Sequence, residues 1–429
     1  MVRRVRIALA AAALCCSADV AQAADLAVEG GDVRFPAEAS SRGTLAVFSR
    51  FERAADGTAG LDVLARRVGA DGRPQGDAVL VGKGAAPGPG LVGEAYAVAF
   101  DRRRTRWLVA WSGREPGMAQ ASCGPPQTFP VSTPACVQAK REVFVRVVDA
   151  DGGVADPARR ITATGDPGDA YASGAAPAVA YDSRADRFLL VSVAADPRRL
   201  GGTLVSHVLD RAGAPVRDGT TLPLTGNAAA TELVSGPDGG YLLGFAGFGG
   251  SDPAERELRV RPLTAAGRPR GRTVTVSPSG GPGASGIRLA MDRDRGEALA
   301  VWAEARSGAS SGFRARRLTV GGRPRGGGVP LPFTVGTGRV DVVGFGRGWL
   351  FGVTEERPEI GHAVLVHRGR ADGRVVGAAR VVSDDDAVTP GLADLGKGRA
   401  LVGWTLSPVS RGTAEAPPPP RPRVRLVRP

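Results

Sequence analysis

The stretch WLVAWSG, residues 107–113, decides the fold, because versions of it recur along the whole chain. The run is apolar throughout, which is typical of a strand buried on both faces. Its relatives are TLAVFSR (44–50), FLLVSVA (188–194), YLLGFAG (241–247), ALAVWAE (298–304), WLFGVTE (349–355) and ALVGWTL (400–406). Aligned, the seven runs place in one column Phe48, Trp111, Ser192, Phe245, Trp302, Val353 and Trp404. Spacings of 51 to 81 residues between these positions indicate a repeat architecture.

Each apolar run belongs to a unit of four strands. A strand such as PAVAYD (177–182) precedes the run across a polar turn, and a half-exposed, alternating strand follows it. That third strand ends at a glycine, which suits a tight turn that needs a positive φ. These glycines are Gly72, Gly152, Gly213, Gly267, Gly322 and Gly373. A fourth strand, such as RTVTVS (272–277), completes the unit.

Seven such meanders predict an all-β fold, a seven-bladed β-propeller of four-stranded antiparallel blades. The last unit lacks its fourth strand, whereas LAVEG (26–30) precedes the first unit without a blade of its own. We therefore expect the N-terminal strand to complete the last blade and close the ring, which leaves no open sheet edge. Residues 24–429 are then a single propeller domain.

The order of elements also resembles a known group of proteins. A strand ending in AYD (180–182), a polar turn, an apolar run and a later DG turn (such as 372–373) are similar to the repeats of secreted bacterial β-propeller proteins of largely uncharacterised function. The resemblance covers essentially all of residues 24–429. It implies an exported bacterial propeller but no particular ligand or reaction, because these repeats encode the blade.

The first 23 residues have the three parts of a secretory signal peptide. Arg3, Arg4 and Arg6 precede a short apolar run, and Ala21 and Ala23 occupy the small-residue positions of a cleavage site. The run is too short for a transmembrane span, and no later segment is long and apolar enough. We expect cleavage near Ala23 and a secreted protein, extracellular or periplasmic.

Two cysteines follow this segment, Cys123 and Cys136, in the proline-rich stretch SCGPPQTFPVSTPAC (122–136). In an oxidising compartment they are predicted to form a disulfide. Two cysteines without a nearby histidine are too few ligands for zinc. We expect neither a metal nor another cofactor.

The formal net charge of +13 comes almost entirely from arginine. A basic chain suits polyanionic partners. Here the arginines alternate with acidic residues in turns and form no dense cluster, which argues against nucleic acid. Binding to a polyanion or to the cell-envelope surface through arginines remains an alternative.

Catalytic motifs are sparse. GASSG (308–312) lies in a Gly/Ser-rich loop without a following helix, so it is not interpreted as a nucleophile elbow. His207, His362 and His367 are interpreted as structural. The most suggestive charges follow the apolar runs, on the face where the loops of the predicted propeller are longest, here named the loop-rich face. They are Glu52, Arg53, Arg114, Glu115, Asp196, Arg198, Glu304, Arg306, Glu355, Glu356 and Arg357.

These observations favour a binding or scaffold module, acting as a monomer, for an extracellular protein, peptide or glycan. The alternative is a propeller hydrolase or lyase acting on an extracellular polysaccharide, with carboxylates such as Glu115, Glu304 or Glu355 as acid and base. Because the repeats encode the blades, the sequence leaves the identity of the ligand or substrate open.

Overall fold

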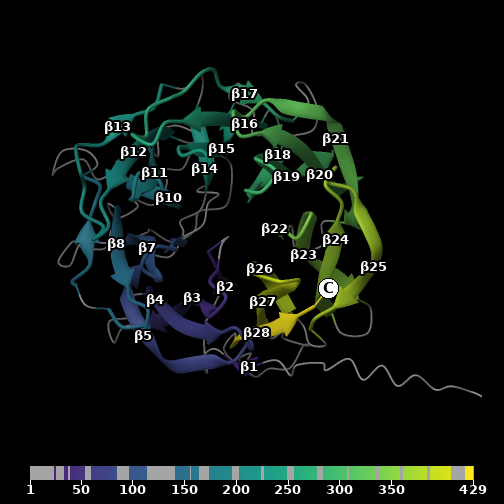
Figure 1. The fold of residues 1–429 in the computed structure, drawn as a ribbon, viewed down its shortest axis with the longest axis horizontal. Helices are drawn as coiled ribbons and strands as arrows, with labels where there is room; N and C mark the ends of the chain where they lie inside the picture. The colour runs from purple at the N-terminus through teal and green to yellow at the C-terminus, as the bar shows by residue number, and fades with distance from the viewer. Residues whose placement is uncertain are drawn as a thin grey trace, which may run out of the picture.

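Seven antiparallel blades stand around a central axis, in the order in which they occur in the chain (Figure 1). The third and fourth blades are joined in one eight-stranded sheet by the pairing of Gly202 with Ala228. The structure is a computed structural model. It describes residues 24–25, 33–36, 39–53, 59–84, 96–113, 141–154, 156–163, 173–195, 202–223, 227–248, 256–277, 284–306, 309–334, 339–357, 361–383, 387–406 and 421–428. The predicted seven-bladed β-propeller is confirmed. Within these ranges, no helix has the length and apolar character to cross a membrane.

Each blade is a meander that runs from the axis outward. The innermost strands are β2 (Val33–Arg34), β6 (Tyr96–Asp101), β10 (Ser173–Asp182), β14 (Asn227–Ser235), β18 (Ala284–Asp292), β22 (Val340–Phe345) and β26 (Ala387–Gly396). The second strands are β3 (Gly43–Arg53), β7 (Arg106–Gly113), β11 (Arg187–Ala195), β15 (Tyr241–Phe248), β19 (Glu297–Arg306), β23 (Gly348–Arg357) and β27 (Arg399–Leu406).

The third strands are β4 (Ala59–Gly69), β8 (Glu142–Val148), β12 (Gly202–Leu209), β16 (Arg256–Leu263), β20 (Ala309–Thr319), β24 (Gly361–Gly369) and β28 (Arg421–Val427). The outer strands are β5 (Pro74–Gly84), β9 (Arg159–Arg160), β13 (Thr220–Thr221), β17 (Val274–Thr275), β21 (Pro324–Thr334) and β25 (Val375–Val381). Three of these have only two residues, and a short edge strand offers little backbone for pairing with another chain.

The seventh blade has the strand order β1-β28-β27-β26. Its outer strand is β1 (Ala24–Asp25), in which Ala24 pairs with Val424 and Asp25 with Arg423. LAVEG (26–30) lies outside the described residues. That the N-terminal strand holds the ring closed therefore stays a prediction.

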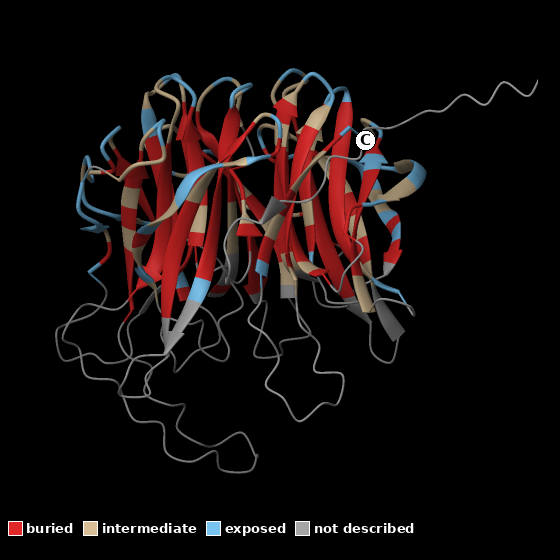
Figure 2. Ribbon diagram, turned by 90° about the horizontal axis from the view of Figure 1, so that it is seen from below, coloured by how far each residue is buried: buried red, intermediate tan, exposed pale blue. Residues whose placement is uncertain are grey.

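The hydrophobic core lies between the blades. Among the described residues, seven buried clusters each combine apolar side chains from two successive blades. One of them joins the last blade to the first, with Leu401 and Val424 beside Val33 and Phe48. The second strands are buried along most of their length (Figure 2), as the apolar runs predict. Trp111, 1 % exposed, belongs to the cluster between the first and second blades.

The six turn glycines confirm the sequence prediction, because all have positive φ between 68° and 92°. Gly267 has a second constraint. A Cβ at this position would lie 2.7 Å from Cδ1 of Leu189 in the preceding blade. The turn therefore supports the packing between blades and also reverses the chain.

Polar contacts join the blades at the turns between innermost and second strands. Arg104 of the second blade donates to both carboxylate oxygens of Asp186 in the third, at 2.6 and 2.7 Å. Asp182 accepts from the backbone N–H of Arg184 in its own turn at 2.8 Å and from that of Gly240 in the next blade at 2.9 Å. These contacts fix the end of the propeller opposite the loop-rich face.

Candidate functional site

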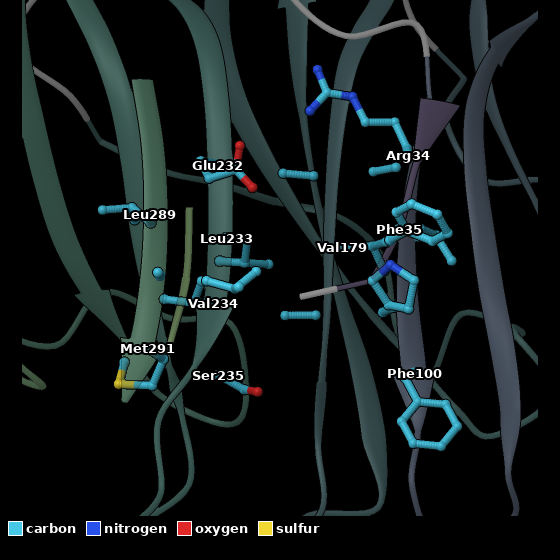
Figure 3. A pocket seen from close by; sticks show the side chains of 18 of the residues that line it. Arg34, Phe35, Phe100, Val179, Glu232, Leu233, Val234, Ser235, Leu289 and Met291 are labelled. Atoms are coloured by element: carbon cyan, nitrogen blue, oxygen red, sulfur yellow. The ribbon is translucent and has the colours of Figure 1, made fainter. Parts of the chain in front are cut away.

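A pocket of about 1080 Å³, including the open space at its mouth, occupies the centre of the propeller. Its walls come from the innermost strands of all seven blades. Arg34 and Glu232 lie towards one end of the pocket, and Phe100, Ser235 and Met291 lie towards the other (Figure 3).

One level of this channel carries charge. In each second strand, one residue immediately precedes the position that aligns with Trp111. This residue pairs with a single residue of the innermost strand of the same blade. These seven residues, here named the inner ring, are Arg34, Ala97, Ala178, Glu232, Arg288, Asp341 and Gly391. Four are charged, and they alternate in sign from the fourth blade to the sixth. The other three are alanine or glycine.

The charged members of the inner ring contact one another. Nη1 of Arg288 lies 3.5 Å from a carboxylate oxygen of Glu232, and Nε of Arg288 lies 3.8 Å from an oxygen of Asp341. Asp341 also accepts hydrogen bonds from the backbone N–H groups of Val342 at 2.9 Å and Leu392 at 2.7 Å. The backbone thus fixes the Asp341 carboxylate, and Arg288 bridges the two acids.

Burial shifts the pKa values of two members of the inner ring. Burial raises the pKa of Glu232, although Arg288 and Arg34 act in the opposite direction. Burial, followed by the nearby charge of Arg288, lowers the pKa of Arg34 to about 10. Arg34 therefore stays charged at neutral pH in surroundings that disfavour its charge.

The backbone is irregular beside the inner ring. β-bulges interrupt β10, β14, β18 and β26 within the few residues before it. Ala176 and Thr389, in two of these bulges, have positive φ of 45° and 58°. The hydroxyl of Thr231 donates to the Ala176 carbonyl at 2.6 Å and so stabilises one bulge from the neighbouring blade. Bulges re-aim side chains and are frequent beside functional sites.

The predicted site residues with described side chains lie away from the central pocket. Glu304, 5 % exposed, is 3.5 Å from Nε of Arg314 on the adjacent strand. Glu355 contacts Arg357 at 3.5 Å and Nε2 of His367 at 3.6 Å. Neither carboxylate lines the pocket, and each has partners within its own blade.

The other predicted site residues are described only in part. Glu356 is exposed on β23, where it pairs with His362. Glu52, Arg53 and Arg306 lie in β3 and β19, where only their backbone is described. The remaining members of the set, together with the expected disulfide, lie outside the described residues: Arg114, Glu115, Asp196, Arg198, Cys123 and Cys136. Their roles remain predictions.

Three of the four charged residues of the inner ring can be recognised from the sequence. Glu232 in TELVS, Arg288 in IRLAMD and Asp341 in VDVVGF each interrupt an otherwise apolar inner strand. Once the second strands are aligned, hairpin pairing places these three charges at one level. Arg34 gives no such signal, because the two-residue strand β2 precedes Pro36 and has no strand pattern.

Many arginines have a structural role between blades. The position six residues before each turn glycine is occupied by Arg66, Arg146, His207, Arg261, Arg316 and His367. Nη1 of Arg146 donates to the Val81 carbonyl at 3.1 Å, and Nη1 of Arg316 donates to the Val276 carbonyl at 2.9 Å. Both acceptors belong to the preceding blade. These arginines therefore supply hydrogen-bond donors to backbone carbonyls near the outer edge of the preceding blade.

His207 occupies the same position in the third blade, and burial lowers its pKa. The unfolded chain, with a histidine pKa near 6.5, then binds more protons than the folded protein as the pH falls through that value. Stability should therefore decrease on acidification from pH 7 to pH 5.5. We expect His207→Gln to flatten this dependence, measured as the thermal unfolding midpoint against pH. If the unfolding midpoint of the variant depends on pH as strongly as that of the original protein, burial does not lower the pKa of His207.

The chain matches no protein-family model, and no curated protein matches it. Among solved structures it is similar to a protein of unknown function from Dyadobacter fermentans, with a TM-score of 0.51 and 11 % identity over 78 % of this chain and 96 % of that chain. It also resembles an α-L-arabinofuranosidase from Fusarium graminearum (TM-score 0.47, 11 % identity, 79 % and 93 % covered) and an α-L-arabinanase from Penicillium chrysogenum (0.45, 10 %, 78 % and 92 %). At such identities the likeness shows the β-propeller fold alone.

Proposed function

We propose that the protein is an exported binding module that holds part of an extracellular glycan, peptide or protein at the inner ring. The observation that carries the proposal is the alignment of four charged residues at one level of the innermost strands. Arg34, Glu232 and Asp341 line the pocket, and Arg288 contacts both acids. Charged groups on inner strands are costly to desolvate, and apolar residues would pack there more favourably. Their presence is explained if they recognise a ligand.

The proposed binding site also includes residues of the loop-rich face. The ends of the second strands and the starts of the innermost strands meet there, as in the pairing of Ser173 with Ala195. Charged residues at the ends of the second strands, including Glu355 and Arg357, would then contact parts of the ligand outside the channel. Export follows from the signal-like residues 1–23, which lie outside the described residues.

Asp341→Asn tests the proposal, because it keeps the size of the side chain and removes its charge. We expect ligands identified on glycan arrays and peptide libraries to bind the variant about tenfold more weakly, since a charge-assisted hydrogen bond contributes about 1.5–3 kcal/mol. The measurement is the dissociation constant by isothermal titration calorimetry. The control is Asp372→Asn, at a turn where the side chain is 44 % exposed. Equal affinities of the two variants would contradict a site at the inner ring.

A polysaccharide hydrolase or lyase is the second candidate, and the raised pKa of Glu232 favours it over the carboxylates of the loop-rich face. A carboxyl whose pKa is raised by burial is suited to general acid catalysis. Release of reducing ends from a panel of polysaccharides, abolished in Glu232→Gln, would support the enzyme. Polyanion binding through surface arginines has less support, because several arginines already bind carbonyls between blades.

A further inference from the structure

The end of the propeller opposite the loop-rich face is formed by tight turns and is here named the turn face (Figure 2). The turns between innermost and second strands are residues 40–42, 102–105, 183–186, 236–240, 293–296, 346–347 and 397–398. The described turns between third and outer strands are residues 69–73, 149–153, 210–214, 264–268, 319–323 and 370–374. In each turn of this second set, the N–H of the first residue donates to the carbonyl of the last at 2.8–2.9 Å. The backbone of the turn face is therefore fixed by short, closed loops.

Acidic and basic side chains of the turn face lie at different depths, although they alternate in the sequence. Asp101 and Asp182 end innermost strands and are 0 % and 2 % exposed. Their carboxylates accept backbone N–H groups of the turns that follow, from Arg103 at 3.0 Å and from Arg184 at 2.8 Å. The side chains of Arg103 and Arg184 are themselves exposed. Buried aspartates thus close the turns, and the alternation along the chain does not neutralise the surface.

Basic side chains dominate the exposed part of the turn face. In the first set of turns, the exposed basic residues are Arg42, Arg102, Arg103, Arg184, Arg347 and Lys397. In the second set, they are Arg73, Arg211, Arg268, Arg323, Arg370 and Arg374. The exposed acidic residues of both sets are Asp71, Asp151, Asp238 and Asp294. Twelve exposed cations thus stand against four exposed anions in these turns, and all seven blades contribute a cation.

This surplus does not depend on any single side chain. Arg184 and Arg374 are paired with aspartates of the turn face at 3.6 and 3.9 Å. Arg102 and Arg103 also interact with other groups of the protein. Without these four, the remaining eight cations still outnumber the four exposed acids. Arginines that donate to carbonyls between blades, such as Arg146, lie on third strands and are not among them.

The arrangement of the cations favours an extended anionic surface over a linear polymer. They come from successive blades around the axis, so they form a ring and not a row (Figure 1). A linear polyanion would contact only part of this ring, whereas a bilayer with anionic headgroups would contact all of it. The guanidinium group also matches phosphate oxygens with paired N–H donors.

We propose that the protein binds the surface of a bilayer that contains anionic phospholipids, through the turn face. The attraction is electrostatic, between the exposed arginines and the phosphate groups of the lipids. In this orientation the loop-rich face points away from the membrane and is accessible to other partners. This inference goes beyond the proposed function and does not depend on a ligand at the inner ring.

Co-sedimentation of the protein with lipid vesicles tests the proposal. One set of vesicles contains phosphatidylcholine alone, and the other contains phosphatidylcholine with phosphatidylglycerol. We expect at least about tenfold stronger partition into the anionic vesicles. Most of this difference should disappear between about 0.1 M and about 1 M sodium chloride, because the Debye length falls from about 10 Å to about 3 Å. Equal partition into both kinds of vesicle at low salt would overturn the proposal.

A triple variant localises the binding to the turn face. Arg211→Gln, Arg268→Gln and Arg323→Gln remove one exposed charge from each of three successive blades. The hydrogen bonds that close these turns are made by the backbone, so the substitutions leave them intact. We expect the triple variant to bind the anionic vesicles at least about tenfold more weakly than the original protein.

Two further variants keep this result interpretable. Arg159→Gln, Arg272→Gln and Arg421→Gln form the control, because these residues are also exposed but lie in or beside strands, outside the turn face. The control should weaken binding less than about threefold, and a loss equal to that of the first triple variant would contradict the assignment to the turn face. Asp151→Asn with Asp294→Asn removes two exposed acids from the turn face and should strengthen binding about threefold or more.

Polyphosphate, a linear chain of phosphate groups, tests the alternative partner. If polyphosphate binds with dependence on the three turn arginines and the anionic vesicles do not bind, the turn face is a polymer site and the membrane proposal is wrong. Asp341→Asn should bind the vesicles as tightly as the original protein does, because Asp341 lines the central pocket. Failure of binding at the inner ring and failure of binding at the turn face are therefore distinguishable.

Discussion

A Trp111→Ala variant is expected to lose about 3–5 kcal/mol of unfolding free energy, the usual cost of removing a large buried aromatic side chain. Trp111 is 1 % exposed and lies between the first two blades. Its ring stacks with Phe144 at 5.9 Å and lies against Gly82, where a Cβ would come within 2.1 Å of it. Its Nε1 also donates to the Lys83 carbonyl at 3.1 Å. Alanine would therefore leave a cavity and remove this hydrogen bond.

Urea unfolding followed by far-UV circular dichroism measures this loss. Leu80→Ala is the control, because Leu80 lies on β5, the outer strand of the first blade, and is 43 % exposed. It should cost well under half as much as Trp111→Ala. Similar losses in the two variants would show that Trp111 is not part of the packing between blades.

A Gly267→Ala variant is expected to lose roughly 2–5 kcal/mol, as the sum of backbone strain of about 1–2 kcal/mol and overpacking of about 1–3 kcal/mol. Gly267 has a φ of 68°, which an L-residue with a Cβ adopts only with strain. The added methyl would lie 2.7 Å from Cδ1 of Leu189 and 3.2 Å from Oγ of Ser206. Both atoms belong to the preceding blade, so the alanine would push two blades apart.

Gly326→Ala separates the two contributions. Gly326 has a similar φ of 72°, but a Cβ there would meet no atom within 4 Å. It should show the strain alone, about 1–2 kcal/mol. The two variants are compared by the same urea unfolding measurement. If Gly326→Ala costs as much as Gly267→Ala, the contact between blades contributes nothing.

The fold could be derived from the sequence because each blade repeats the same local rules. Apolar runs such as 107–113 must be covered on both faces, and turn glycines such as Gly267 need a positive φ. These requirements act over a few residues and leave a pattern that recurs along the chain. The strand β2 shows the limit, because Val33–Arg34 is too short to have a period.

The candidate site could not be derived in the same way. The sequence drew attention to charges after the second strands, such as Glu304 and Glu355, because charged residues beside buried runs stand out. The structure gives these two carboxylates partners within their own blades. Arg34 and Asp341, more than 300 positions apart in the chain, instead line the same pocket.

The sequence by itself determined the blade, the number of blades and the glycine turns, because these depend on short-range periodicity and on backbone conformation. Only the tertiary structure decided that Arg34, Glu232, Arg288 and Asp341 share one level of the channel. That arrangement depends on hairpin register and on the closing of the ring around an axis. It also changes the meaning of WLVAWSG: the run and its Trp111 form the wall between blades, and the charges that face the channel belong to the strand that precedes each such run.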